Sequence, residues 1–415
     1  MSDAFDQDAQ FKCPGHHPHL RRVDHKPCEE VAKSILLGAS NSWFSVSISA
    51  LSIPLATDRL AKIVEEQWGE LKGVQSQEEL QFFRKMLQKF PSLVSLFSDF
   101  NDPEILEAIE TKKSSAGQDD GSVPDIKLPE WRVFSNPDTA VENRDFKLRK
   151  APPPKGFEDI FEDTVLVERI REVSALLGYT RLESNADFAE ITALEELRIS
   201  PISRTPPTWL PASEVRGEGI FLRLKEGALE SWESRKGVQQ LRLDFLESHK
   251  LWRKLRKLTP THDGFPGIRL VLLHSLAHAL IRQIVLDCGY NSASLRERLY
   301  CRWGSDHGGP MAGILIYTAA PDSEGTLGGL VELGNPASLG RHLQQALESM
   351  RVCASDPLCS EHAPSSDGRG IHGACCHACL FAPETSCERG NRYLDRAVLV
   401  GTFASSETAF FKSFR

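Results

Sequence analysis

Three kinds of segment are missing from this 415-residue chain. Its first residues, MSDAFDQDAQFKC, are acidic and polar and lack the basic start and apolar run of a secretory signal. No stretch reaches the roughly 20 apolar residues that a membrane span needs. We therefore expect a cytoplasmic protein without membrane attachment. No Gly-x-x-x-x-Gly-Lys-Ser/Thr run occurs either, so the sequence predicts no ATP binding by a P-loop and no autonomous motor.

The chain also lacks an excess of positive charge. Its 49 Lys and Arg residues are outnumbered by 57 Asp and Glu residues, which gives a net charge of −8. Binding to nucleic acid over a whole surface depends on Lys and Arg displacing counterions from phosphates, and this balance argues against it. Any contact with DNA must be local.

One helical pattern, within residues 225–258, offers such a local surface. Basic side chains fall on one face of it and an aromatic residue adjoins them, which suits contact with phosphates and a base, although a solvated helix face has the same pattern. The candidates are Lys250, Trp252, Arg253, Lys254 and Lys257.

The composition is that of a globular protein, with 40% hydrophobic and 26% charged residues, and the length favours more than one domain. Apolar residues alternate with serines from Phe44 to Ile48, a strand pattern, and helical periodicity follows from 58 to about 113. Later runs at Trp131–Phe134, Thr164–Val167 and Gly219–Leu224 resemble strands. We predict a multi-domain α+β fold with four parts. These are an N-terminal Cys/His loop and strand segment (1–56), a helical block and linker (57–125), a mixed middle region (126–260) and a C-terminal cysteine-rich domain (261–415).

The C-terminal region opens with a helix, Ile268 to Leu286, that is apolar nearly all round and is therefore expected to pass through a core. Ser294 and Glu297 have the spacing of a capping box, which predicts another short helix. Gly313 to Tyr317 is typical of a buried strand.

Six of the ten cysteines lie between Cys353 and Cys387, and two of them form the pair Cys376-His-Ala-Cys379. A C-x2-C pair suits tetrahedral zinc because its tight turn brings two thiolates to one ion. Two more ligands must come from elsewhere, and we expect Cys359 and Cys387. Four thiolates would close the coordination shell, so such a Zn²⁺ ion would be structural. Residues that could substitute as ligands are Cys353, Cys375, His362, His372 and His377.

Other interpretations of the cysteines stay open. They could be free thiols, or the C-x2-C pair could be a redox motif, although such a motif normally opens a helix in a βαβ unit and needs no further cysteines nearby. Near the N-terminus, Cys13 and Cys28 bracket four histidines. This segment could hold a second metal ion or be an ordered loop with surface histidines.

His274 and His278 stand four residues apart on the apolar helix and could face one ion or substrate. The zincin motif needs Glu directly after the first His, where this chain has Ser275. Core histidines satisfied by a buried carboxylate are the favoured interpretation. A rival hypothesis is a metal-dependent hydrolase or nuclease that uses both histidines together with Asp322 and Glu324, which otherwise cap a turn.

Three motifs together resemble a known family: LHSLAHAL (273–280), GILIYTAAPDSEGTLGGL (313–330) and HGACCHACLFAPETSCERGNR (372–392). The chain looks like the MrfA-like zinc-binding domain, found at the C-terminus of certain DNA-repair helicases and in the DrmB component of DISARM anti-phage systems. GASNSWF (38–44) and SALSIP (49–54) are similar to DrmB in particular. The resemblance covers the ends of the chain well and its middle poorly.

This resemblance implies a non-catalytic, zinc-binding subunit that pairs with a separate DrmA-like helicase and helps it engage foreign DNA. The four-cysteine site would then map onto Cys359, Cys376, Cys379 and Cys387. DrmB-like chains tend to carry a fuller N-terminal cysteine set than Cys13 and Cys28, which leaves a second site there open. A DNA-binding module that acts alone is a third hypothesis.

Overall fold

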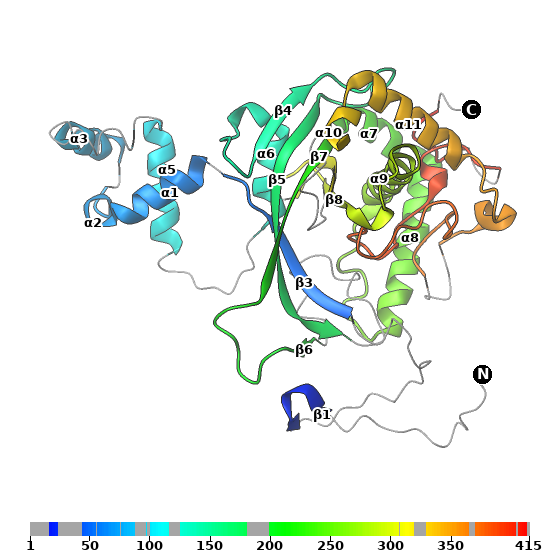
Figure 1. Cartoon of the computed structure of the whole chain (residues 1–415), viewed down its shortest axis with the longest axis horizontal. Helices are drawn as coiled ribbons and strands as arrows, with labels where there is room; N and C mark the ends of the chain where they lie inside the picture. The colour runs from blue at the N-terminus through cyan, green and yellow to red at the C-terminus, as the bar shows by residue number, and fades with distance from the viewer. Residues whose placement is uncertain are drawn as a thin grey trace.

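The structure is a computed structural model of the whole chain. It describes residues 16–23, 44–54, 56–74, 76–87, 97, 100–115, 125–180, 199–306, 308–318, 329–364, 370–403 and 406–412. Helices lie beside a curled antiparallel sheet, and a cysteine-rich segment follows at the C-terminal end (Figure 1). The predicted α+β class is confirmed.

A seven-stranded sheet is the framework of the fold. Its main path runs in the order β3-β5-β7-β9-β8, and β4 and β6 pair with β5. Every pairing is antiparallel, and β5 and β7 are the long strands that bend across Figure 1. The strands are β3 (Phe44–Leu51), β4 (Lys147–Ala151), β5 (Thr164–Thr180), β6 (Ser200–Pro201), β7 (Ala212–Arg223), β8 (Leu295–Arg302) and β9 (Met311–Thr318). A separate two-stranded sheet joins β1 (His16–His17) to β2 (Arg22–Val23) around η1 (Pro18–Leu20).

Strand β9 shows why both faces of the sheet are covered. All eight of its residues are buried. Because side chains alternate between the faces of a strand, Ile314 and Ile316 enter one apolar cluster while Leu315 and Tyr317 enter another. The predicted buried strand at Gly313–Tyr317 is therefore present, with a core on either side.

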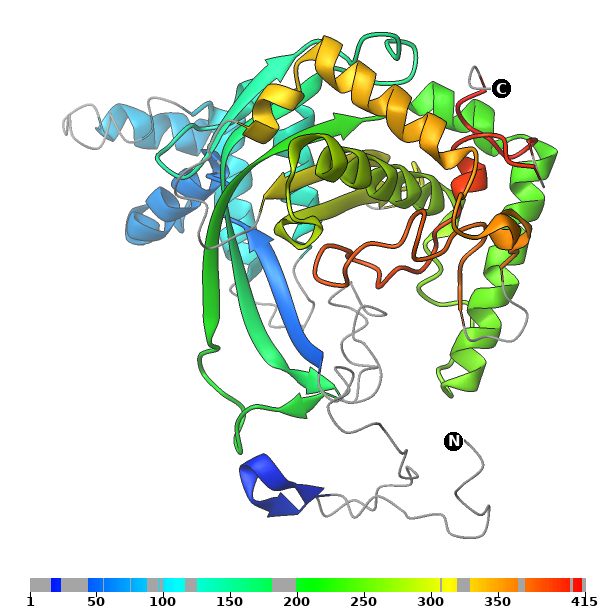
Figure 2. The ribbon, with the colours of Figure 1, turned by 45° about the vertical axis from the view of Figure 1, so that its right-hand side comes forward.

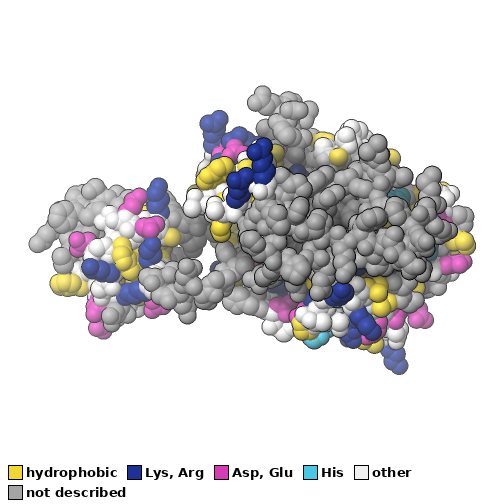
Figure 3. All heavy atoms as spheres, turned by 90° about the horizontal axis from the view of Figure 1, so that it is seen from below, with side chains coloured by type: hydrophobic (Ala, Val, Ile, Leu, Met, Phe, Trp, Pro, Cys, Tyr) yellow, Lys and Arg dark blue, Asp and Glu magenta, His cyan; other side chains and the backbone are white. Residues whose placement is uncertain are grey.

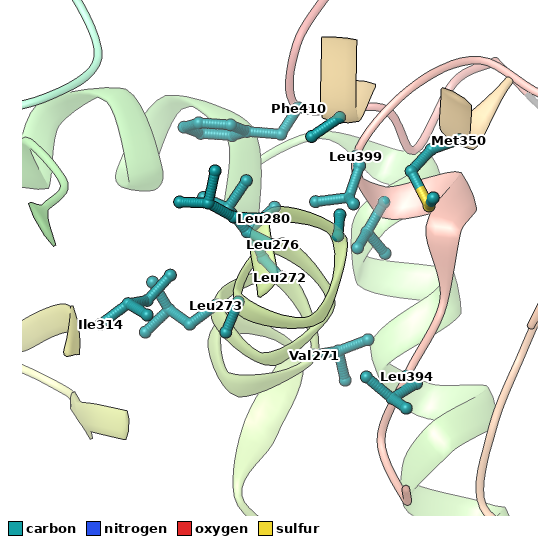
Figure 4. Close-up of a cluster of buried hydrophobic side chains, with 14 of the residues drawn as sticks. Val271, Leu272, Leu273, Leu276, Leu280, Ile314, Met350, Leu394, Leu399 and Phe410 are labelled. Carbon is teal, nitrogen blue, oxygen red and sulfur yellow. The ribbon is translucent and has the colours of Figure 1, made fainter. Parts of the chain in front are cut away.

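The larger of these cores is built around α9 (Gly267–Cys288), which lies between the sheet and helices α8 and α11 (Figures 1 and 2). Leu272, Leu273, Leu276 and Leu280 of α9 meet side chains from β9, α11 and the C-terminal segment (Figure 4). The helices on this side are α7 (Glu226–Glu233), α8 (Lys236–Leu255), α10 (Gly329–Leu333) and α11 (Pro336–Met350).

Among the described residues, α9 is the helix that by length and composition could cross a membrane, and 78% of its 18-residue apolar window is buried inside the protein. Its apolar surface is used by the core, as the all-round apolar pattern predicts.

A helical block lies apart from the sheet, at the left of Figure 1. It has an apolar cluster of its own, to which Leu60, Val64, Leu80, Ile105 and Ile109 belong. The helices of the block are α1 (Ala56–Glu66), α2 (Trp68–Leu71), α3 (Gln77–Leu87) and α5 (Asp102–Ser115).

Two local predictions were wrong. The run Trp131–Phe134 belongs to a helix, α6 (Lys127–Ser135), followed by η3 (Pro137–Thr139). The buried residues of α6 are Glu130, Trp131, Val133 and Phe134. Their spacing is helical once the charged Glu130 is counted as part of the buried face. The capping-box helix is also absent, because η6 (Ser292–Ser294) leads directly into β8, and Glu297 lies on that strand.

Candidate metal centres

The described residues after α11 contain little regular structure, in contrast to the sheet. Their short elements are η7 (Pro357–Glu361) and η8 (Arg396–Val398), separated by turns and single bridges. With few ladder hydrogen bonds, this segment must be held by side chains.

Four cysteine sulfurs from three parts of this segment converge, and we name Cys353, Cys359, Cys376 and Cys379 the sulfur cluster. Cys353 follows α11, Cys359 lies in η7, and the other two lie in the turn that carries the C-x2-C pair. All four Sγ atoms lie within 4.8 Å of one another. Their side chains are largely buried.

The separations between the sulfurs fit one tetrahedral ion. Sγ atoms are 3.6 Å apart for Cys353–Cys376, 3.6 Å for Cys359–Cys379 and 3.7 Å for Cys376–Cys379. Zinc binds thiolates at about 2.3 Å, which places tetrahedral sulfurs about 3.8 Å apart. Neutral thiols have no comparable reason to gather four at a time in a buried place, so the donor set fits Zn²⁺.

The electrostatics of the sulfur cluster favour a cation. Burial raises the pKa of Cys359 and of Cys379, because a thiolate is poorly solvated there. Burial acts the same way on Cys376, but hydrogen bonds from the backbone N–H groups of Ala378 and Cys379 lower its pKa overall. A divalent ion would supply the charge that stabilises all four thiolates, and since they complete its shell, it would be structural.

A buried arginine, Arg396, supports the sulfur cluster. Arg396, 1% exposed, donates from Nη1 to the carbonyl oxygens of Met350 (2.6 Å) and Arg351 (3.1 Å), at the end of α11 that precedes Cys353. It also hydrogen-bonds the Cys359 thiol and favours its deprotonated form. Arg396 thus both positions the cluster and offsets its negative charge.

We therefore expect Arg396→Met to keep the zinc but to weaken its binding by about 10–100-fold, the usual cost of losing an outer partner of a metal ligand. Competition with a chromogenic chelator measures this affinity. An unchanged affinity in a folded variant would show that Arg396 supports only the end of α11.

The structure divides the four predicted ligands between two groups. Cys359, Cys376 and Cys379 come together, but Cys387 is not part of the sulfur cluster, and Cys353, offered by the sequence only as a substitute, takes its place. The chain between Cys379 and Cys387 crosses to α9, where the Cys387 Sγ lies 3.1 Å from His274 Nε2. The Cys375 Sγ is directed at the carbonyl of Leu394, 3.5 Å away. In the described part of the chain, His362, His372 and His377 do not belong to any group of converging side chains that could hold a metal ion.

A second group contains Cys387. It consists of His274 and His278 from α9, Glu297 from β8 and Cys387 from the turn, and we name it the mixed cluster. A buried carboxylate does stand beside both histidines, as the favoured interpretation holds, but sequence reasoning missed Glu297 because it expected a helix cap there. Burial disfavours charge on these groups, yet their mutual attraction raises the pKa of His274 to about 9 and lowers that of Cys387 to about 7.

Several other candidates lie outside the described residues. These are Asp322 and Glu324 of the hydrolase hypothesis, and Cys13 and Cys28 of the possible N-terminal site.

The predicted basic stripe is only partly on the surface. Trp252 is 3% exposed and Arg253 is 5% exposed, so neither presents itself to a phosphate. The Trp252 ring lies between the guanidinium groups of Arg256 and Arg392, at 4.2 and 4.5 Å from its centroid. Lys250 is half-buried and paired with Glu247. Lys254 and Lys257 are the exposed members, and Lys257 lies beyond the end of α8.

Comparisons with known proteins agree with this geometry. The family model of the MrfA Zn-binding domain matches residues 276–380, a range that contains all four members of the sulfur cluster. The chain is 32% identical over 413 residues to the DISARM protein DrmB of Bacillus paralicheniformis, covering 98% of this chain and 71% of that protein.

A solved structure of the DUF1998 helicase MrfA bound to DNA is also similar. It shares 11% identity with this chain at a TM-score of 0.23, and the match covers 53% of this chain and 23% of the helicase. A likeness of this size supports no inference about function.

Proposed function

Since this chain belongs to the DrmB family of DISARM proteins, we propose that it serves as a zinc-stabilised accessory subunit without ATPase activity of its own. Membership itself makes it a component of a DISARM-type defence system. The single observation that carries the accessory role is the sulfur cluster, whose four thiolates leave no open position on a zinc ion.

The zinc would have a mechanical task. When bound, it stabilises thiolate charge and fixes geometry, and it offers no water for hydrolysis. Cys353 would hold the end of α11, Cys359 would hold η7, and the C-x2-C pair would hold the turn. This turn also contacts α9, because His278 Nδ1 hydrogen-bonds the carbonyl oxygen of Leu380 at 2.8 Å. The ion would thus connect an irregular segment to the central helix.

We further propose that the subunit works with a DrmA-like helicase and contacts DNA locally. The charge distribution supports a local contact: on the face shown in Figure 3, the Lys and Arg side chains of the described residues are interspersed with Asp and Glu. Lys254 and Lys257, at the end of α8, are the exposed basic residues that remain from the predicted stripe. A cytoplasmic location fits the thiol chemistry, since the eight cysteines of the described residues are all free.

The accessory role is tested by co-expressing the chain with a DrmA-like helicase and assaying both. We expect the two to co-purify, the chain alone to hydrolyse neither ATP nor DNA, and the helicase to bind DNA more tightly when the chain is present. Hydrolysis of ATP or DNA by the purified chain alone would contradict the proposal and favour the hydrolase hypothesis.

The DNA contact is tested by a double variant. Lys254→Ala with Lys257→Ala is expected to weaken DNA binding by the complex and to reduce the slope of log affinity against log salt by about 2, one for each lost phosphate contact. Lys62→Ala with Lys72→Ala, two exposed lysines of the helical block, is the matched charge control. Equal effects from both pairs would show that only net charge matters.

A further inference from the structure

The mixed cluster lies at the junction of α9, β8 and the C-terminal turn, and its donor atoms are close enough for a common ion. His274 Nε2 lies 3.1 Å from both Cys387 Sγ and Glu297 Oε1, and His278 Nε2 lies 3.4 Å from the same Glu297 oxygen. One donor atom from each residue falls within 4.8 Å of the others. All four residues are buried, with exposed fractions from 0% for His274 to 7% for Cys387.

The surrounding backbone orients these donors toward one another. The Nδ1 atom of His278 is engaged by the carbonyl oxygen of Leu380, which leaves Nε2 directed at the cluster. The Glu388 N–H donates to Glu297 Oε1 at 3.1 Å. The N–H groups of Arg389 and Asn391 donate to Cys387 Sγ at 3.4 and 3.2 Å. Metal ligands typically have such outer hydrogen bonds, which fix the tautomer of a histidine and the direction of a thiolate or carboxylate.

Among the buried side-chain atoms that have no hydrogen bond within the described residues, three belong to the mixed cluster. They are His274 Nδ1, His278 Nε2 and Glu297 Oε2. A buried polar atom without a partner carries a substantial free-energy cost, and a buried carboxylate beside a thiolate needs positive charge close by. A divalent ion at the centre of the mixed cluster would provide both a partner and the charge.

The helix and strand explain how the donors converge. His274 and His278 are one turn apart and so share the face of α9 that meets the sheet. Leu295 on β8 enters the core around α9. Glu297 lies two residues further along the same strand, so its side chain is on the same face of the sheet. A strand therefore presents the carboxylate to the helix from one side, and the turn after Ser386 presents the thiolate from another.

We propose that His274, His278, Glu297 and Cys387 hold a second metal ion, a structural Zn²⁺ bound through two imidazole nitrogens, one carboxylate oxygen and one thiolate. Imidazole and thiolate together select zinc among the common divalent cations, and four protein ligands leave no position for catalysis. The ion would be separate from that of the sulfur cluster. The matched family segment, 276–380, contains all four cysteines of the sulfur cluster but neither His274 nor Cys387.

A second ion would anchor the turn between Cys379 and Cys387 at both of its ends. One end of the turn, Cys379, belongs to the sulfur cluster, and the other end, Cys387, belongs to the mixed cluster. Between these ends, the carbonyl oxygen of Leu380 is hydrogen-bonded to His278. This inference does not depend on the proposed accessory role, because it concerns metal content and not helicase function.

Zinc content and zinc-edge X-ray absorption of the purified full chain test the proposal. We expect two zinc ions per chain, with five sulfur ligands at about 2.3 Å and three nitrogen or oxygen ligands at about 2.0–2.1 Å shared between them. Glu297→Gln and His278→Gln should each leave one zinc ion that is bound by sulfur alone.

His249→Gln is the matched control. His249 is also a buried histidine, hydrogen-bonded to the Tyr393 hydroxyl at 2.6 Å, but it lies outside both clusters. This variant should retain both ions. The proposal is overturned if the wild-type chain holds a single zinc with four sulfur ligands, a result that needs no variant to fold. It is also overturned if folded Glu297→Gln and His278→Gln proteins both retain two ions.

Discussion

Replacing Cys376 and Cys379 together by serine is expected to release the zinc of the sulfur cluster and to unfold the segment that follows α11. Structural zinc sites contribute roughly 10–16 kcal/mol of apparent binding free energy in small zinc domains. The described residues of this segment have little regular structure that would replace that contribution. We expect the loss of one zinc per chain by elemental analysis. Hydrogen exchange should become fast across 351–364 and 370–380, the parts that carry the sulfur cluster, while the sheet stays protected.

The control for this variant is the neighbouring Cys375→Ser. Cys375 is as buried as the ligands, but its thiol is directed at Leu394 and lies outside the cluster. It should keep its zinc and its protection from exchange. If the double variant kept a full complement of zinc, another set of ligands would have to hold it.

Glu130→Ala is expected to destabilise the sheet by about 3–5 kcal/mol, the usual result of leaving one partner of a buried ion pair alone. Glu130 on α6 is 2% exposed and accepts two hydrogen bonds from Arg298 on β8, at 2.6 and 2.7 Å. It also accepts from the Tyr300 hydroxyl at 2.9 Å and from the backbone N–H of Leu51 at 3.2 Å. One carboxylate therefore connects α6, β8 and β3, and its removal leaves a buried guanidinium without charge balance.

Denaturant unfolding followed by tryptophan fluorescence measures this loss. Glu168→Ala is the matched control, because Glu168 also pairs with two cations, Lys147 and Arg149, but in a solvent-accessible place. Pairs of that kind contribute about 0–1 kcal/mol. Similar losses in the two variants would contradict the role given to Glu130.

Local patterns predicted part of this structure well. The all-round apolar helix and the alternating strand at Phe44–Ile48 are present because burial on all sides, or on one face, leaves its period in the sequence. The crowding of cysteines also located the sulfur cluster. What no local pattern contains is the pairing of distant segments: Cys353 rather than Cys387 completes the cluster because α11 ends beside the turn.

Buried charged residues misled the sequence analysis for a related reason. Glu130 and Glu297 look like surface residues until their partners, Arg298 and the two histidines of α9, are known. Because Glu130 was counted as a polar surface residue, the helical spacing of α6 was missed. Because Glu297 was interpreted as part of a helix cap, the strand β8 was missed. Arg298 is 168 residues from Glu130, and His274 and His278 are 23 and 19 residues from Glu297, so only the tertiary structure reveals these partners.

The sheet also bears on how the chain is divided. Strand β3 lies in the predicted first part and pairs with β5 of the middle region. Strand β7 of the middle region pairs with β9 of the last part. Hydrogen bonds therefore cross the predicted boundaries near 56 and 260. We propose that the helical block, with its separate apolar cluster, is the one part that forms a unit distinct from the sheet.

The central claim is that four sulfurs hold one zinc ion and thereby fix the segment after α11. An anomalous difference map, from a crystal measured at the zinc edge, tests it most directly. We predict a peak about 2.3 Å from each sulfur of Cys353, Cys359, Cys376 and Cys379. No peak among these four sulfurs, or a peak bonded to Cys387 with Cys353 turned away, would contradict the account.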